Sequence, residues 1–177
     1  MPFKEGRRNY ITTSGIPFKH QLEVMFPGDT RNSGVQKEFE TRKQDVFFNT
    51  PLDDDTIFAL NGLKKLGIKV IVSSNNYHEF VLKYFNKYND FSFDMILGYK
   101  DGFAKGKAHI LHVINEFRIT ENEMIFVGDS LHDGDVAQEL GIPFIGRIAI
   151  RTREEFLERF PDIYCVDKLT QILDLFG

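Results

Sequence analysis

Residues 125–133 read IFVGDSLHD, an apolar run that is followed at once by a glycine, a serine and two aspartates. The run 124–127 predicts a strand buried on both faces, with Asp129 just beyond its carboxyl end. A turn or first helical turn can then bring Asp133 back towards Asp129. Two carboxylates presented in this way suit Mg²⁺, which prefers hard oxygen ligands, so we predict that both bind metal. The competing interpretation is an acidic turn that only caps the following helix.

Two other patterns place polar residues beside predicted elements. Ser74 and Asn75 follow the apolar, β-branched run 69–73, and a hydroxyl with free backbone N–H groups at a strand end can cradle phosphate. Lys105 precedes the helix that leads into the Asp129 strand, where a lysine can offset charge on a transferring phosphoryl group. Lys107 competes for that role. Taken singly, these residues also fit an ordinary strand end and an ordinary surface lysine.

Outward from these patterns, apolar β-branched runs alternate with helical stripes, which is typical of βαβ units and a parallel sheet with helices on both faces. The predicted strands are 69–73, 94–97, 124–127, 144–148 and 163–166, and the predicted helices are 57–63, 77–88, 107–117, 134–140, 154–160 and a final one at the C-terminus. We therefore expect a three-layer, doubly wound, Rossmann-like α/β fold of four or five parallel strands. In such sheets the ligand lies beyond the carboxyl ends of the strands, where the candidate residues fall.

Residues 1–50 differ from the rest of the chain because they contain no convincing strand. Helix-like patterns occupy 18–26 and 35–47, separated by a Pro-Gly-Asp break at residues 27–29. We expect two parts, a small helical subdomain over 1–50 and an α/β core over 51–177.

The composition is that of an ordinary globular protein, with 42% apolar and 27% charged residues over 177 positions. A net charge of −4 argues against a nucleic-acid surface, which needs clustered Lys and Arg. The single Cys165 permits no disulfide within the chain, and no apolar run approaches the roughly 18 residues of a membrane span. We expect a cytoplasmic protein without nucleic-acid or membrane partners.

In order and rough spacing, Ser74-Asn75, Lys105 and the Gly-Asp-Ser…Asp run ending at Asp133 resemble the second, third and fourth motifs of haloacid-dehalogenase-like hydrolases. Residues 121–144 are especially similar to the phosphoglycolate-phosphatase-like branch, and residues 1–50 resemble the back part of its helical cap. The resemblance implies Mg²⁺-dependent hydrolysis of a small phosphorylated metabolite through an aspartyl-phosphate intermediate. By this analogy Ser74 holds the phosphoryl oxygens, Lys105 neutralises them, and Asp129 binds Mg²⁺ with support from Asp133.

The family's first motif, an apolar strand ending in Asp-x-Asp-x-Thr or Val, has no match between residues 1 and 51. Asp53 and Asp55 are the only lexical candidates. No strand precedes them, and an acidic first turn of a helix explains them through the helix dipole. In the family that strand lies between the ones predicted here at 69–73 and 124–127. Without it these must pair directly, leave a gap or accept a strand from elsewhere, and dimerisation becomes plausible.

Three hypotheses follow from the missing motif. The first is a shortened form of a longer phosphatase, the second is a nucleophile-free module that binds a phosphorylated ligand or regulates, and the third is a partner chain that supplies the strand. A receiver-like domain would need a phospho-accepting aspartate after its third strand, which the sequence at 97–99 lacks.

Other residues have weaker claims to function. We interpret the histidines as solvent-facing rather than as a zinc site, and three basic residues of the N-terminal part are candidates for contact with the anionic end of a substrate. They are His109, His112 and His132, and Arg7, Arg8 and Lys19.

Overall fold

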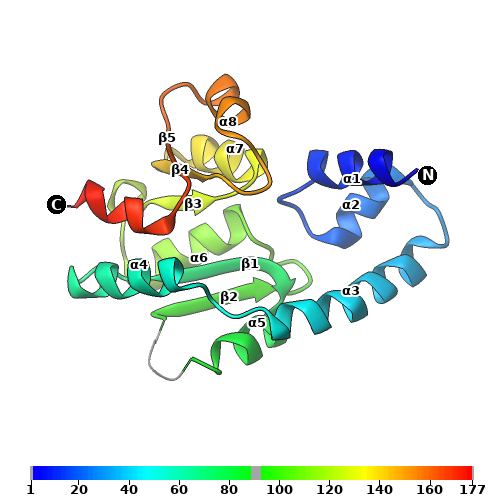
Figure 1. The fold of residues 1–177 in the computed structure, drawn as a ribbon, viewed down its shortest axis with the longest axis horizontal. Coiled ribbons are helices and arrows are strands. Elements are labelled where there is room, and N and C mark those ends of the chain that lie inside the picture. The colour runs from blue at the N-terminus through cyan, green and yellow to red at the C-terminus, as the bar shows by residue number, and fades with distance from the viewer. Residues whose placement is uncertain (1, 89–92, 177) are drawn as a thin grey trace.

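The computed structural model describes residues 2–88 and 93–176 (Figure 1). The N-terminal part consists of three helices, α1 (Phe3–Thr12), α2 (Phe18–Met25) and α3 (Asn32–Asn49), and holds no strand among its described residues. The predicted helical patterns at 18–26 and 35–47 correspond to α2 and α3, while α1 covers residues for which no helical range was predicted. Glycines at positive φ, Gly15 and Gly28, lie in the two connections between these helices.

From residue 54 onward helices and strands alternate as expected. The elements are α4 (Asp54–Lys65), β1 (Ile71–Tyr77), α5 (His78–Phe85), β2 (Met95–Tyr99), α6 (Lys107–Phe117), the 3₁₀ turn η1 (Glu121–Glu123), β3 (Phe126–Gly128), α7 (Leu131–Leu140), β4 (Phe144–Arg147), α8 (Arg153–Arg159), β5 (Tyr164–Val166) and η2 (Leu169–Leu175). The final helix is a 3₁₀ helix. All pairings between the named strands are parallel, so the predicted α/β class is confirmed.

The strands form two sheets and not the single sheet that we expected. One sheet has the order β1-β2 and the other the order β3-β4-β5, and no ladder joins β1 to β3 within the described residues. We considered direct pairing of β1 with β3, a gap between them, or a strand from elsewhere. Direct pairing is excluded in this structure.

Each side of the β3 sheet is covered by an apolar cluster. Phe126 belongs to the cluster that includes residues of α6, α7 and α8, among them Phe156, which is fully buried. Val127, which points the other way, belongs with Leu63 of α4 and residues of η2 such as Ile172 to a second cluster. Alternate side chains of one strand thus enter opposite layers, as a sheet covered on both faces requires.

Strand β1 departs from the expectation of complete burial, because all seven of its residues are only half-buried. Helix α5 packs against β1 and β2, yet the edge of β1 that faces away from β2 has no strand beside it in the described chain. The apolar run at 69–73 correctly indicated a strand, but burial also needs neighbours that this part of the molecule lacks.

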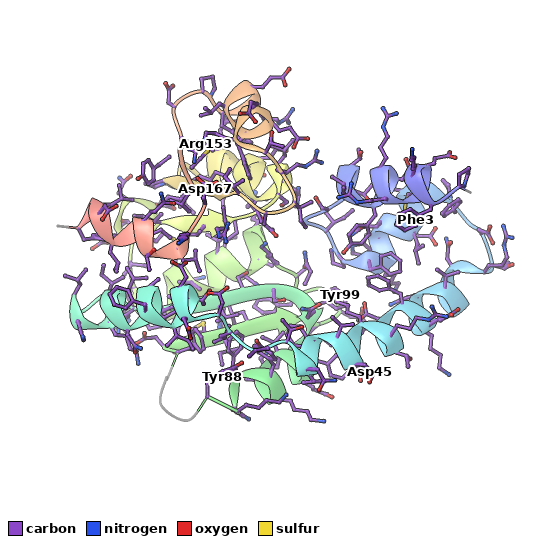
Figure 2. All side chains as sticks on the ribbon, viewed as in Figure 1. Phe3, Asp45, Tyr88, Tyr99, Arg153 and Asp167 are labelled. Atoms are coloured by element: carbon purple, nitrogen blue, oxygen red, sulfur yellow. The ribbon has the colours of Figure 1, made fainter. Side chains whose placement is uncertain are left out.

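Peripheral contacts fasten the elements to one another. Arg153 at the start of α8 donates to Asp167, which follows β5, at 2.7 Å, and Figure 2 shows the two side chains together. Asp53 is the N-cap of α4 and accepts a hydrogen bond from the Thr56 N–H at 2.7 Å. Asp55 accepts from the Leu169 N–H at 2.8 Å, so both acidic residues have structural partners. Among helices in the described ranges, none combines the length and apolarity needed to cross a bilayer.

Candidate functional site

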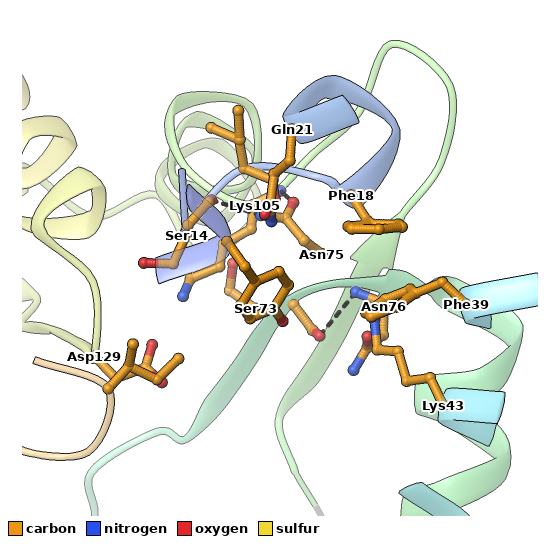
Figure 3. A pocket seen from close by; sticks show the side chains of 15 residues that line it. Ser14, Phe18, Gln21, Phe39, Lys43, Ser73, Asn75, Asn76, Lys105 and Asp129 are labelled. Atoms are coloured by element: carbon orange, nitrogen blue, oxygen red, sulfur yellow. Dashed lines mark hydrogen bonds between the residues drawn. The ribbon is translucent and has the colours of Figure 1, made fainter. Parts of the chain in front are cut away.

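A cavity of about 280 Å³ lies where the carboxyl ends of β1 and β3 meet the N-terminal helices (Figure 3). Ser74, Asn75, Lys105 and Asp129 all line it. Their elements are β1, the loop before α6 and the loop after β3, which lie far apart in the sequence and meet because parallel strands deliver their carboxyl ends to one edge.

Asp133, the fifth predicted site residue, is buried behind this cavity rather than exposed in it. It is 1% exposed, and its Oδ2 accepts a hydrogen bond from the Lys105 Nζ at 2.8 Å. Its backbone N–H donates to the Ser130 Oγ at 3.2 Å, which caps α7. Gly128 allows this packing, because a Cβ there would lie 2.5 Å from the Asp133 carboxylate. Asp133 therefore positions Lys105 and also belongs to the first turn of the helix.

Of the two candidate lysines, the structure brings Lys105 into the cavity and leaves Lys107 outside it. Lys107 pairs with Glu139 at 2.6 Å, and both side chains are more than half exposed. Asn75 fixes the Lys105 loop by accepting a hydrogen bond from the Lys105 backbone N–H at 3.1 Å. The same amide donates to the Gly15 carbonyl at 2.7 Å, so Asn75 joins the N-terminal part to the core.

Asp129 makes no hydrogen bond or ion pair with any residue in the described ranges, and it is the one carboxylate among the described residues that line the cavity. Burial raises the pKa of the Tyr10 hydroxyl, and the negative charge of Asp129 adds to that rise. A carboxylate that faces a cavity without a protein donor can bind a cation.

The donor set fits Mg²⁺ only as a partial site. No group of three or more His, Cys, Asp or Glu that could hold a metal occurs in the described part of the chain, and Asp133 is already bound to Lys105. Mg²⁺ is commonly held by one or two carboxylates while water and substrate phosphate complete its octahedron. Asp129 fits that arrangement as a single ligand.

The N-terminal helices contribute the other side of the cavity, and the sequence did not identify the residues that they supply. The rings of Phe18 and Phe39 stack with their centroids 3.8 Å apart. Lys43 lies beside Phe39, and burial lowers the pKa of the Lys43 ammonium. Gln21 is buried and donates to the Ile16 carbonyl at 3.0 Å. The sequence does show aromatic residues and a lysine on these helices. It does not show that they face the carboxyl end of β1 across a cavity.

Arg7, Arg8 and Lys19, the basic residues predicted to touch a substrate, are exposed and do not line the cavity.

His109 corrects another expectation, because it is 1% exposed instead of solvent-facing. Its Nδ1 is 2.9 Å from the Ser73 Oγ, and its Nε2 is buried with no hydrogen-bond partner among the described residues. Burial lowers the pKa of His109 to about 4, so the ring is neutral at pH 7. The helical position on α6 could not reveal this, since His112, three residues on, is exposed.

The fold and this cavity define the class of the protein. Residues 8–147 match the model of the haloacid dehalogenase-like hydrolase family. The chain therefore belongs to that family, as its motifs at Ser74, Lys105 and Asp129 indicated.

Solved structures with the same fold extend the comparison. A haloacid dehalogenase-like family protein of Streptococcus pneumoniae aligns with a TM-score of 0.77 at 20% identity over 96% of this chain and 81% of its own. A predicted phosphatase of Clostridium acetobutylicum gives 0.77 at 21% identity, over 92% and 77%. A candidate phosphoglycolate phosphatase of Lactobacillus delbrueckii subsp. bulgaricus gives 0.71 at 18% identity over 83% of this chain, which spans 63% of that protein. At these identities the likeness establishes the fold. No curated protein matches the chain significantly in sequence.

Proposed function

We propose that this chain forms the phosphate-binding and metal-binding part of a Mg²⁺-dependent phosphatase that acts on a small phosphomonoester. The observation that carries the proposal is the meeting of Ser74, Asn75, Lys105 and Asp129 in one cavity at the carboxyl ends of β1 and β3. Membership of a hydrolase family supports the same conclusion.

Each residue has a role that its contacts support. The Ser74 hydroxyl and backbone N–H groups at the carboxyl end of β1 would hold phosphoryl oxygens. The Lys105 ammonium, held 2.8 Å from Asp133, would neutralise their charge without adjusting its position during the reaction. Asn75 would keep the Lys105 loop and the Gly15 loop in register. Asp129 would hold Mg²⁺, which would supply charge stabilisation at the phosphoryl group.

The size and lining of the cavity also indicate what kind of substrate would fit. A volume of about 280 Å³ suits a small metabolite. Opposite the phosphate side, Lys43 and the stacked Phe18 and Phe39 rings offer one cation and an aromatic surface. A substrate with a compact organic part and a second anionic group would match this lining.

A second candidate function is a module that binds a phosphorylated ligand without hydrolysing it. The observation in its favour is that Asp129 is the sole carboxylate lining the described cavity, while the sequence holds no Asp-x-Asp motif after an apolar strand. With Asp129 assigned to the metal, no second carboxylate among the described lining residues is present to act as the nucleophile.

Phosphate release from an aryl phosphate, measured with and without Mg²⁺, separates the two functions. A phosphatase requires sustained turnover that Asp129→Asn abolishes. The binding module requires no turnover but retained binding of a phosphate ester, which Lys105→Met should weaken about 10-fold or more because a charge-assisted contact is lost. A chain that shows no turnover and also no binding of the phosphate ester would contradict both proposals.

A further inference from the structure

Three aromatic side chains, each from a different N-terminal helix, line the cavity opposite Ser74 and Lys105. Tyr10 comes from α1, Phe18 from α2 and Phe39 from α3. The ring centroids of Tyr10 lie 6.3 Å and 6.2 Å from those of Phe18 and Phe39, which are themselves 3.8 Å apart. The three rings therefore form one continuous group, which we call the aromatic wall.

The aromatic wall is not the enclosed core of the helices that carry it. Leu22 is the one buried apolar residue in the described parts of α1, α2 and α3. Tyr10 is 37% exposed, and Phe18 and Phe39 are half-buried. The rings therefore keep apolar surface beside the cavity that a bound ligand could cover.

Tyr10 offers more free ring surface than its two neighbours. Phe39 is stacked on Phe18, and the Lys43 ammonium lies over the Phe39 ring, 5.3 Å from its centroid. Tyr10 meets the two phenylalanine rings only in tilted arrangements, at interplanar angles of 56° and 48°. A ligand ring could therefore pack on Tyr10 without displacing a stacked ring of the described chain.

The aromatic wall lies where the organic part of a bound phosphomonoester would extend. Phe18 and Phe39 lie across the cavity from Asp129, which is on the phosphate side (Figure 3). Burial raises the pKa of the Tyr10 hydroxyl, and the negative charge of Asp129 adds to that rise. The phenol therefore stays protonated at pH 7, and no phenolate repels an anionic ligand.

We propose that the aromatic wall selects phosphomonoesters whose organic part is a planar aromatic ring, and that Tyr10 contacts that ring. The inference rests on the proposed function, because the ring is placed against the wall by a phosphoryl group bound on the other side of the cavity. Aromatic rings pack together offset or edge to face, and such a contact stabilises a complex beyond the area that it buries. A saturated ring of the same carbon count has at least as much apolar surface, so burial alone would not disfavour it.

The test measures the binding of three phosphonates to the full 177-residue chain by isothermal titration calorimetry in the presence of Mg²⁺. Methylphosphonate probes the phosphate side alone. Benzylphosphonate and (cyclohexylmethyl)phosphonate carry the same charge and rings of equal carbon count, and their C–P bonds are not phosphoester bonds that a phosphatase would cleave. We expect benzylphosphonate to bind roughly 3- to 10-fold more tightly than the cyclohexylmethyl compound.

Tyr10→Leu should reduce the ratio of the two affinities to about 1, because leucine is apolar and favours a helix but has no aromatic ring. Phe3→Leu is the matched control and should leave the ratio unchanged. It removes a ring from the same helix, but Phe3 is 84% exposed and does not line the cavity. If circular dichroism shows that Tyr10→Leu does not fold, nuclear Overhauser contacts between the phenyl protons of benzylphosphonate and the Tyr10 ring decide the assignment on the unmodified chain.

Equal binding of the two ring compounds, tighter binding of the saturated one, or a preference that persists in Tyr10→Leu would overturn this inference. Absence of the Overhauser contacts to Tyr10 would do the same. In each of these cases, binding of methylphosphonate would still support the proposed function. If none of the three phosphonates binds, the proposed function is contradicted and this inference is overturned with it.

Discussion

The Lys105–Asp133 ion pair is the contact on which the arrangement of the site depends, and its strength can be measured. The Lys105 Nζ lies 2.8 Å from the Asp133 Oδ2, with side-chain exposures of 15% and 1%. Removing one member of a buried ion pair commonly costs ~3–5 kcal/mol, because the other charge is left without compensation. We therefore expect Lys105→Met to lower the free energy of unfolding by about 3 kcal/mol at pH 7.

The opposite substitution should cost less. Asp133→Asn leaves Lys105 unpaired, but that ammonium adjoins the cavity and can be hydrated, so we expect a loss of about 1–2 kcal/mol. The double variant should be less destabilised than the sum of the two single variants, by about 2 kcal/mol, because the residues interact directly.

Urea denaturation followed by circular dichroism gives these values, provided that the m-values agree among the variants. Lys107→Met is the matched control, since Lys107 forms a similarly short pair with Glu139 at 2.6 Å but at exposures of 55% and 58%. An exposed pair of this kind contributes ~0–1 kcal/mol. Equal losses for the two methionine variants, or single losses that simply add within about 0.5 kcal/mol, would refute the role assigned to the Lys105 pair.

Three further predictions concern stability. Burial lowers the pKa of His109 to about 4, so between about pH 6.5 and pH 4 the unfolded state binds a proton more readily than the folded state. The free energy of unfolding should therefore decrease as the pH is lowered through that range, by about 3 kcal/mol from this group. His109→Gln should reduce this decrease in parallel urea titrations. Gly15→Ala should lower the unfolding free energy by about 1–3 kcal/mol, because Gly15 has a φ of +99° and a Cβ would lie 2.5 Å from the Ser130 Oγ; a variant as stable as the parent in thermal denaturation would contradict this. Phe156→Ala should cost about 3–5 kcal/mol, since Phe156 is fully buried among aromatic neighbours, and a loss below about 1 kcal/mol would show that the cluster repacks.

The site is stabilised by contacts between residues that are distant in sequence. Arg151, just after β4, donates to the Ile11 carbonyl of α1 at 2.8 Å, and Asn75 donates to the Gly15 carbonyl at 2.7 Å. These two hydrogen bonds hold the N-terminal part against the core at the cavity. Through Gln21, which donates to the Ile16 carbonyl, the loop after α1 is also tied to α2.

The sequence by itself determined the class of the fold and the edge at which the site forms. The apolar runs at 69–73 and 124–127 predicted β1 and β3 because β-branched residues bounded by glycine and polar residues favour short strands. Ser74 and Asp129 were found by the rule that parallel strands present their carboxyl ends at one edge. These features depend on residues that are close together in the chain, so they can be predicted from the sequence.

Only the tertiary structure decided how these parts combine. It divided the strands into two sheets, selected Lys105 over Lys107 for the cavity, and buried His109. Each outcome depends on which residues lie opposite one another in space, as in the pairing of Arg151 with Ile11 across 140 positions. Hydrophobic periodicity specifies the face that a residue occupies but not the partner that meets that face, since burial and charge pairing arise only when separate elements pack together.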